Sequence, residues 1–330
     1  MIAGLIYAES IITPLLMALF ISIVCAQPIL WMQKKKVPLW IAISLVFIGI
    51  IGIFVGFGEL IGSSLSSFSE NSPIYEQNLL DMSASIQEYL NNWGITLPTD
   101  KLSTIFDATK VMGITSDFLG QLGSFMSNAF TIFFLVLFLL LELDSFSLKT
   151  KAMAVSTNAS VDYLSKIINS IRNYLSIKTM TSLLTGILVW VSLAIIGVDY
   201  AIIWALIAFL FNYIPNIGSI IAALPAVLFA LVQLGFGGII WTTLVFVVVN
   251  LVVGNVIEPK MMGKGMGLST FVVFASLIFW GFLLGTVGMF LSVPLTMSIK
   301  IVLEQNENTR WVAVFLGTDE DAKALIEEKN

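Results

Sequence analysis

Residues 200–257 read YAIIWALIAFLFNYIPNIGSIIAALPAVLFALVQLGFGGIIWTTLVFVVVNLVVGNVI and contain no Asp, Glu, Lys or Arg. A membrane-spanning helix needs about 20 predominantly apolar residues, so this stretch is long enough for more than one membrane segment. The backbone of such a segment must satisfy its own hydrogen bonds in lipid, which favours helices. The stretch therefore predicts an all-α polytopic membrane protein.

The composition of the whole chain supports this prediction. Of its 330 residues, 58% are hydrophobic and 11% are charged, whereas a soluble domain carries about 25% charged residues. Further stretches without Asp, Glu, Lys or Arg lie between Lys36 and Glu59, Asp117 and Glu142, Lys178 and Asp199, and Lys264 and Lys300. Together these stretches predict about 8 membrane segments.

The residue types that are missing exclude several classes of protein. The chain has no His and a single Cys, Cys25, so Ser–His and Cys–His catalytic pairs and an internal disulfide are impossible. The net charge of −5 argues against a nucleic-acid partner. The sequence has no Gly-rich phosphate loop. We expect neither an enzyme nor a cofactor or metal site.

Charge and hydropathy divide the chain into five parts. Residues 59–117 contain eight acidic and two basic residues, which predicts a small water-exposed helical domain. Residues 2–33 form either one helix or a hairpin broken at Pro14. The predicted parts are N-terminal transmembrane helices (1–58), an extracytoplasmic acidic helical domain (59–121), a helix with a basic linker (122–178), a transport domain (179–303) and a cytoplasmic tail (304–330).

The basic residues predict how the chain is oriented. Short loops rich in Lys and Arg remain in the cytoplasm. Lys34–Lys36, the 144–178 loop and Lys260 with Lys264 should therefore be cytoplasmic. The acidic part of the chain should lie on the opposite side.

Two apolar stretches are interrupted in a similar way. Pro215 and Gly218 interrupt residues 200–233, and Gly285 and Gly288 interrupt residues 268–303. We expect two re-entrant helical hairpins, and counting membrane crossings gives them opposite orientations. Inverted repeats with interrupted helices are typical of secondary transporters.

The interruptions could also form a binding site. Irregular backbone at membrane depth is tolerated where it is buried in protein or lines a cavity. Asn212 and Asn216 beside the first interruption could then bind a polar solute. The alternative is that Pro and Gly are simply common in membrane helices.

Glu258 is the best candidate for a titratable group in the transport half. It lies in the string Asn255-Val256-Ile257-Glu258-Pro259-Lys260, where it could bind a cation, accept a proton or lock a gate. Alternatively it caps a loop through a salt bridge to Lys260. Arg172 and Lys178 could anchor a helix at the membrane border, steer an anionic solute or pair with Glu258.

Several strings in the sequence match a known pattern in order and spacing. They are Pro38-Leu39-Trp40, Tyr174–Thr179, Gly197–Tyr200, Phe211–Gly218, Asn255–Lys260 with Gly263, and Trp280–Gly288 followed by Pro294. Over about residues 11–303, the chain resembles the autoinducer-2 exporter family of bacterial permeases. The resemblance implies a homo-oligomer in the inner membrane and makes the Pro215–Gly218 turn and the Asn255–Lys260 string hallmark positions.

The resemblance leaves three functions open. Members of the family are linked to export of a quorum-sensing furanone precursor, which implies a secondary transporter that exports a small polar solute similar to autoinducer-2. Other members are linked to sodium–proton exchange, which implies a sodium(lithium)/proton antiporter. A non-transporting membrane scaffold is the third. The expected partners are the lipid bilayer, further copies of the chain and a small polar solute or monovalent cation.

Overall fold

The regular secondary structure described by the computed structural model is entirely helical. The structure describes residues 8–92, 129–142, 162–262 and 267–319, together with residues 113, 120, 145, 148, 149, 152, 322 and 323. The helices are α2 (Glu9–Lys34), α3 (Leu39–Asn92), α7 (Asp162–Ile196), α8 (Ala201–Phe211), α9 (Gly218–Val252), the π-helix η1 (Val253–Ile257), α10 (Glu258–Met262), α11 (Thr270–Glu304) and α12 (Arg310–Leu316). A shorter apolar helix covers Ala129–Leu141.

Among the described residues, five helical segments are long and apolar enough to cross a membrane. By length and composition these are α2, the Leu39–Tyr89 part of α3, the Ser165–Ile196 part of α7, Gly218–Met262 and α11. Large apolar side chains such as Ile53, Phe138 and Ile195 are exposed. Exposed apolar surface on this scale fits a lipid-facing exterior, and the prediction of a multi-pass helical membrane protein is confirmed at this level.

The first apolar stretch is one helix over its described part. α2 continues through Pro14 and Pro28, so a hairpin broken at Pro14 is wrong for residues 9–34. The helix ends at the lysine run, where Lys36 has a left-handed φ of 65°. Residues 1–7 lie outside the described part.

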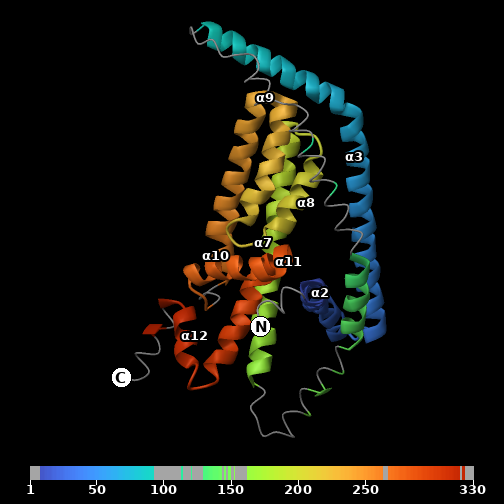
Figure 1. Cartoon of the computed structure of the whole chain (residues 1–330). Coiled ribbons are helices and arrows are strands. Elements are labelled where there is room, and N and C mark those ends of the chain that lie inside the picture. The colour runs from blue at the N-terminus through green and yellow to red at the C-terminus, as the bar shows by residue number, and fades with distance from the viewer. Residues whose placement is uncertain are drawn as a thin grey trace.

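α3 is far longer than a membrane segment. Its 54 residues correspond to about 80 Å, against about 30 Å for the hydrocarbon core of a bilayer. The helix runs without interruption across the predicted boundary at residue 58, and its distal part passes over the end of the central bundle (Figure 1). The predicted acidic domain beyond Asn92 lies largely outside the described residues.

Helices α7 to α11 form the central bundle, and two of them contain breaks. The backbone leaves the helical region at Gly235 in α9 (φ 69°, ψ −151°) and at Gly285 in α11 (φ 60°, ψ −147°). Across the second break, Trp280 Nε1 donates a hydrogen bond of 3.0 Å to Thr296 Oγ1. Sixteen residues of straight helix would separate these residues by about 24 Å, so α11 is not a straight rod.

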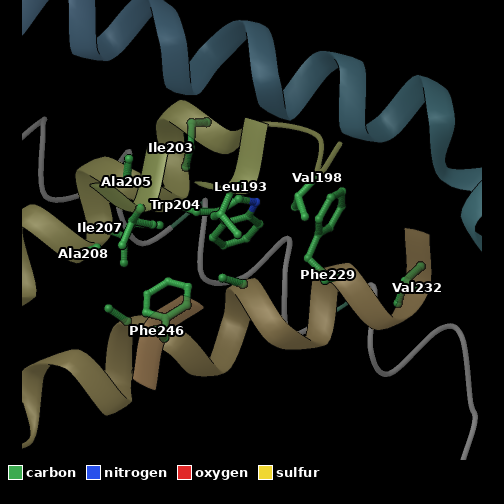
Figure 2. Close-up of a cluster of buried hydrophobic side chains, with 14 of the residues drawn as sticks. Leu193, Val198, Ile203, Trp204, Ala205, Ile207, Ala208, Phe229, Val232 and Phe246 are labelled. Atoms are coloured by element: carbon green, nitrogen blue, oxygen red, sulfur yellow. The ribbon is translucent and has the colours of Figure 1, made fainter. Parts of the chain in front are cut away.

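A large apolar cluster fills one part of the bundle (Figure 2). Trp204, Phe229 and Phe246 are among its buried rings, and Val189 and Leu193 join it from α7. Phe229 is the centre of this cluster because its ring lies 5.4–6.0 Å from the rings of Phe68, Tyr75, Tyr200 and Trp204. A smaller cluster joins α2 and α3 to the 129–141 helix through side chains that include Ala18, Ala42 and Val136.

Candidate functional site

One face of α7 carries the buried polar side chains around which the site is built. Lys178, Thr181, Ser182 and Thr185 are all buried, and their spacing of three, one and three residues places them on one side of a helix. Further along the same face, Val189 and Leu193 are buried and apolar. The buried face of α7 therefore changes from polar to apolar partway along its length.

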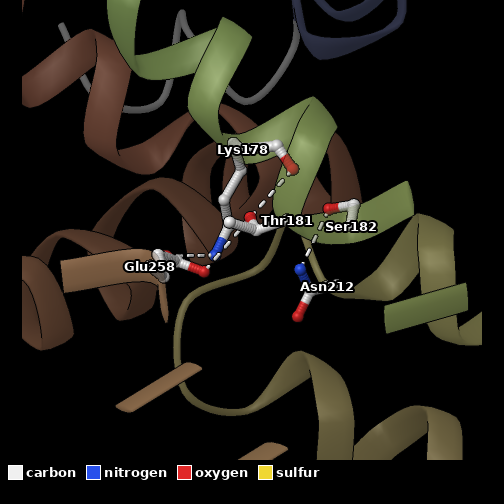
Figure 3. Close-up of polar contacts among 5 residues, drawn as sticks. All are labelled: Lys178, Thr181, Ser182, Asn212 and Glu258. Atoms are coloured by element: carbon white, nitrogen blue, oxygen red, sulfur yellow. Dashed lines mark hydrogen bonds and ion pairs between the residues drawn. The ribbon is translucent and has the colours of Figure 1, made fainter. Parts of the chain in front are cut away.

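Lys178 and Glu258 form a buried ion pair on this face. Lys178 Nζ lies 2.6 Å from Glu258 Oε1, and the two side chains are only 5% and 15% exposed. Thr181 Oγ1 donates to Glu258 Oε2 at 3.4 Å (Figure 3). Burying two charges is costly unless each neutralises the other, so Lys178 and Glu258 depend on one another for their burial.

The π-helix η1 directly precedes Glu258. A π-turn accommodates one residue more than an α-helical turn, and α10 begins at Glu258 directly after it. Pro259 follows Glu258 in α10, and its missing backbone N–H disfavours regular α-helical hydrogen bonding at this place. Lys260 is exposed and forms no ion pair among the described residues, so the predicted loop-capping salt bridge from Glu258 to Lys260 is wrong.

The turn between α8 and α9 packs against the same face of α7. Asn212 is buried, and its Nδ2 donates to Ser182 Oγ at 3.0 Å (Figure 3). The Tyr213 hydroxyl donates to Thr179 Oγ1 at 2.8 Å. Asn216 has a left-handed φ of 61°, a conformation that Asn tolerates better than most residues.

These elements line an open cavity of about 370 Å³. Its polar lining consists of the Lys178–Glu258 pair together with Asn212, Asn216, Ser219, Asn250, Asn255 and Thr270. Each Asn amide offers two donors and an acceptor. A cavity of this size with several amides and an internally neutralised ion pair suits a small polar molecule.

The start of α11 lines this cavity through Thr270, whereas the break at Gly285 in the same helix lies beside α2. A Cβ built on Gly285 would lie 3.0 Å from Glu9 Oε1, so the carboxylate of Glu9 is close to the break in α11. The described residues contain no group of three or more His, Cys, Asp or Glu that could hold a metal ion.

Comparison with known proteins identifies the family. The model of the AI-2E family transporter matches residues 1–308. The chain belongs to the AI-2E family of transporters. It is therefore a member of a transporter family and not of an enzyme family, in agreement with the prediction from the sequence.

Relatives of this AI-2E family transporter match it over nearly its full length. A Haemophilus influenzae protein named "Putative transport protein" is 42% identical over 330 residues, covering 98% of this chain and 94% of the relative. The Escherichia coli K12 protein named AI-2 transport protein TqsA is 38% identical over 315 residues, covering 96% and 92%. "Putative transport protein YhhT" of the same organism is 34% identical, covering 96% and 90%.

The structure of this AI-2E family transporter brings together seven of the predicted site residues. Asn212, Pro215, Asn216, Asn255, Glu258, Pro259 and Lys178 all line the cavity. Lys260, Arg172, Gly218, Gly285 and Gly288 do not. Gly218 packs against the Phe211 carbonyl and Gly288 against the Trp280 carbonyl, so both occupy places of close backbone approach.

Sequence reasoning missed Thr181, Ser182, Ser219 and Asn250. Thr181 and Ser182 could have been found from their helical spacing to Lys178. Ser219 and Asn250 are polar residues within long apolar stretches, and such residues commonly face the interior of a helical bundle in membrane proteins. The motifs recognised in the sequence include none of these four positions.

Proposed function

We propose that this AI-2E family transporter is a secondary transporter that exports a small polar solute similar to autoinducer-2, through the cavity beside Lys178 and Glu258. The observation that carries the proposal is the amide-rich lining. Four Asn residues line the cavity, and its two charges are paired with each other. Amides can bind the hydroxyl groups of an uncharged solute. The name of the relative TqsA supports the choice of solute.

We infer that the two interruptions are tips of re-entrant hairpins of opposite orientation. The break between α8 and α9 is supported by the packing of Gly218 against the Phe211 carbonyl. The break in α11 is supported by the hydrogen bond between Trp280 and Thr296. Rocking of two such units about a central site is a common route to alternating access.

The apolar cluster around Phe229 supplies the closed side of this proposed pathway. Along α7 the cavity-lining Lys178 is followed by the buried Val189 and Leu193 of that cluster. A dry, close-packed layer excludes water and polar solutes. In the proposed cycle this layer separates the cavity from the opposite side of the membrane until the two hairpin units move.

The remaining topology is proposed on the charge distribution. We place Lys34–Lys36, the basic residues of segment 144–178 and Lys260 in the cytoplasm and the acidic residues from 59 to 121 outside. The five predicted parts, residues 1–58, 59–121, 122–178, 179–303 and 304–330, are kept as the working division. A homo-oligomer in the bacterial inner membrane completes the proposal.

The decisive experiment is reconstitution of the purified protein in liposomes with measurement of autoinducer-2 flux. Asn255→Ala and Asn216→Ala should each reduce the flux, because they remove amides from the cavity lining. Asn308→Ala is the matched control, since Asn308 is exposed and far along the chain from the cavity. Wild-type flux no greater than that of empty liposomes would overturn the assignment of this solute.

A second candidate, sodium(lithium)/proton antiport, is favoured by the carboxylate of Glu258. In such a cycle the carboxylate would exchange its partner Lys178 for a proton or a monovalent cation. Sodium-driven pH change in the same liposomes should then disappear in Glu258→Gln, while flux of an uncharged solute persists. The absence of both autoinducer-2 flux and a sodium-driven pH change would favour the third function, a membrane scaffold.

A further inference from the structure

A groove between α2 and α7 collects basic and aromatic side chains at the end of an apolar helix. It has a volume of about 540 Å³ and is lined by Gln27, Leu30, Trp31, Gln33, Lys34 and Arg172. None of these six residues is acidic, and two are cationic. The groove is separate from the cavity proposed for transport, because the two share no lining residue.

The groove lies where a membrane border is expected. Lys34–Lys36 directly follow the apolar α2 and directly precede the apolar start of α3. Trp31 and Trp40, on either side of this lysine run, are 57% and 70% exposed. Exposed Trp beside Lys is typical of the level at which lipid headgroups lie.

Arg172 is held in the groove with hydrogen-bonding capacity left over. Its Nε is buried and has no hydrogen-bond partner, and neither Arg172 nor Lys34 forms an ion pair among the described residues. A buried donor without a partner is costly. The site therefore favours an acceptor that the described residues do not supply.

The position of Arg172 is fixed by contacts between the two helices. Gln27 Nε2 donates to the Arg172 carbonyl at 3.3 Å, and Ser176 Oγ donates to Gln27 Oε1 at 2.7 Å. Beside the groove, Lys35 Nζ lies 3.9 Å from the centroid of the Trp31 ring. A third cation is thus held next to the opening.

We propose that this groove binds the phosphodiester headgroup of an anionic phospholipid. Guanidinium groups match phosphate oxygens in a bidentate arrangement, and basic pockets between transmembrane helices bind such headgroups. Arg172 and Lys34 contact the phosphate, and the exposed apolar face of α2, including Leu15 and Leu19, lies beside the acyl chains. The lipid joins the N-terminal helix to the transport half at its border.

The test is lipid binding by the purified full-length protein in mild detergent, followed by native mass spectrometry with added phosphatidylglycerol, cardiolipin or phosphatidylcholine. The double variant Lys34→Gln/Arg172→Gln should bind phosphatidylglycerol roughly twenty-five-fold more weakly, since each basic residue near an anionic lipid strengthens binding about fivefold. Binding of phosphatidylcholine should not change. Lys149→Gln, which removes an exposed lysine outside the groove, should bind all three lipids like the wild type.

Two further measurements separate loss of charge from loss of fold, and a bound lipid from bound inorganic phosphate. The charge-conserving variant Lys34→Arg/Arg172→Lys should retain its preference for phosphatidylglycerol, which separates loss of charge from loss of fold. Inorganic phosphate should not raise the unfolding temperature as phosphatidylglycerol does. Equal binding of anionic and zwitterionic lipid, or full protection by inorganic phosphate, would overturn the assignment to a lipid.

Discussion

Lys178 and Glu258 are eighty residues apart in sequence, yet the Lys178 ammonium donates a 2.6 Å hydrogen bond to the Glu258 carboxylate. The pair connects α7 to the segment that follows the π-helix. Both side chains are largely shielded from bulk solvent. The stability of the bundle should therefore depend on both charges being present or both being absent.

Glu258→Gln should destabilise the folded protein because it leaves the Lys178 charge buried without a partner. Breaking a buried pair in this way costs about 3–5 kcal/mol. The double variant Lys178→Met/Glu258→Gln should recover part of that loss, and both can be measured by unfolding in one detergent. Glu142→Gln breaks the exposed pair with Lys149 and should cost about 1 kcal/mol or less. If Glu258→Gln lowered the free energy of unfolding no more than this control, the conclusion that the pair is buried would be wrong.

Gly238→Ala should destabilise the protein, whereas Gly237→Ala should be nearly neutral. A Cβ on Gly238 would overlap the Ala230 carbonyl oxygen, and a Cβ on Gly237 meets nothing within 4 Å. Overpacking of this kind costs about 1–3 kcal/mol. The comparison is made by thermal unfolding of the two variants. Equal unfolding temperatures would contradict the close approach of the two sides of the Gly235 break.

Cysteines placed at Trp280 and Thr296 should be joined by a short bifunctional thiol reagent. Their side chains are within hydrogen-bond distance across Gly285, while a straight α11 would hold them about 24 Å apart. The experiment uses a Cys25→Ala background, because Cys25 is the only native cysteine. The shift in electrophoretic mobility of the crosslinked chain is the readout. The control is Ile278→Cys with Thr296→Cys, because Ile278 is exposed. If the pair at 280 and 296 formed no more crosslink than this control, the break in α11 would be wrong.

Tyr75→Phe should loosen the contact between the distal part of α3 and the bundle. The Tyr75 hydroxyl donates a 3.0 Å hydrogen bond to Asp199 Oδ2, and a hydrogen bond to a charged group contributes about 1.5–3 kcal/mol. Hydrogen exchange of backbone amides near residue 75 should become faster. Tyr89→Phe provides the matched comparison because Tyr89 is exposed, and equal exchange in both variants would argue against this role of Asp199.

Much of the fold could be predicted from where charges are absent. The interruptions at Asn212–Gly218 and near Gly285 were located from Pro and Gly, because these residues break helices wherever they occur. The transport domain was predicted to begin at residue 179, whereas the helix that crosses this boundary, α7, begins at Asp162. Hydropathy marks where a helix enters lipid and says nothing about how far the same helix continues in water.

The site was predicted less completely because its central contact is not local. The sequence left several partners open for Glu258, the neighbouring Lys260 and the distant Lys178 and Arg172. It pairs with Lys178 because the bundle brings α7 and η1 together. No spacing rule connects residues eighty positions apart, and only the tertiary packing selects one lysine over the other.

The η1 segment has a consequence for how this site tolerates insertions and deletions. The π-turn already holds one residue more than an α-turn, so removing Val256 would let it rewind as ordinary α-helix with little rotation of the helix before it. Removing Val253 as well would rotate everything before the turn by about 100° relative to Glu258. Every cavity-lining side chain would still be present, yet the carboxylate would face a different neighbour. This turn can thus lose one residue and keep the orientation of the site, whereas the loss of a second residue would change that orientation without changing the site's chemistry.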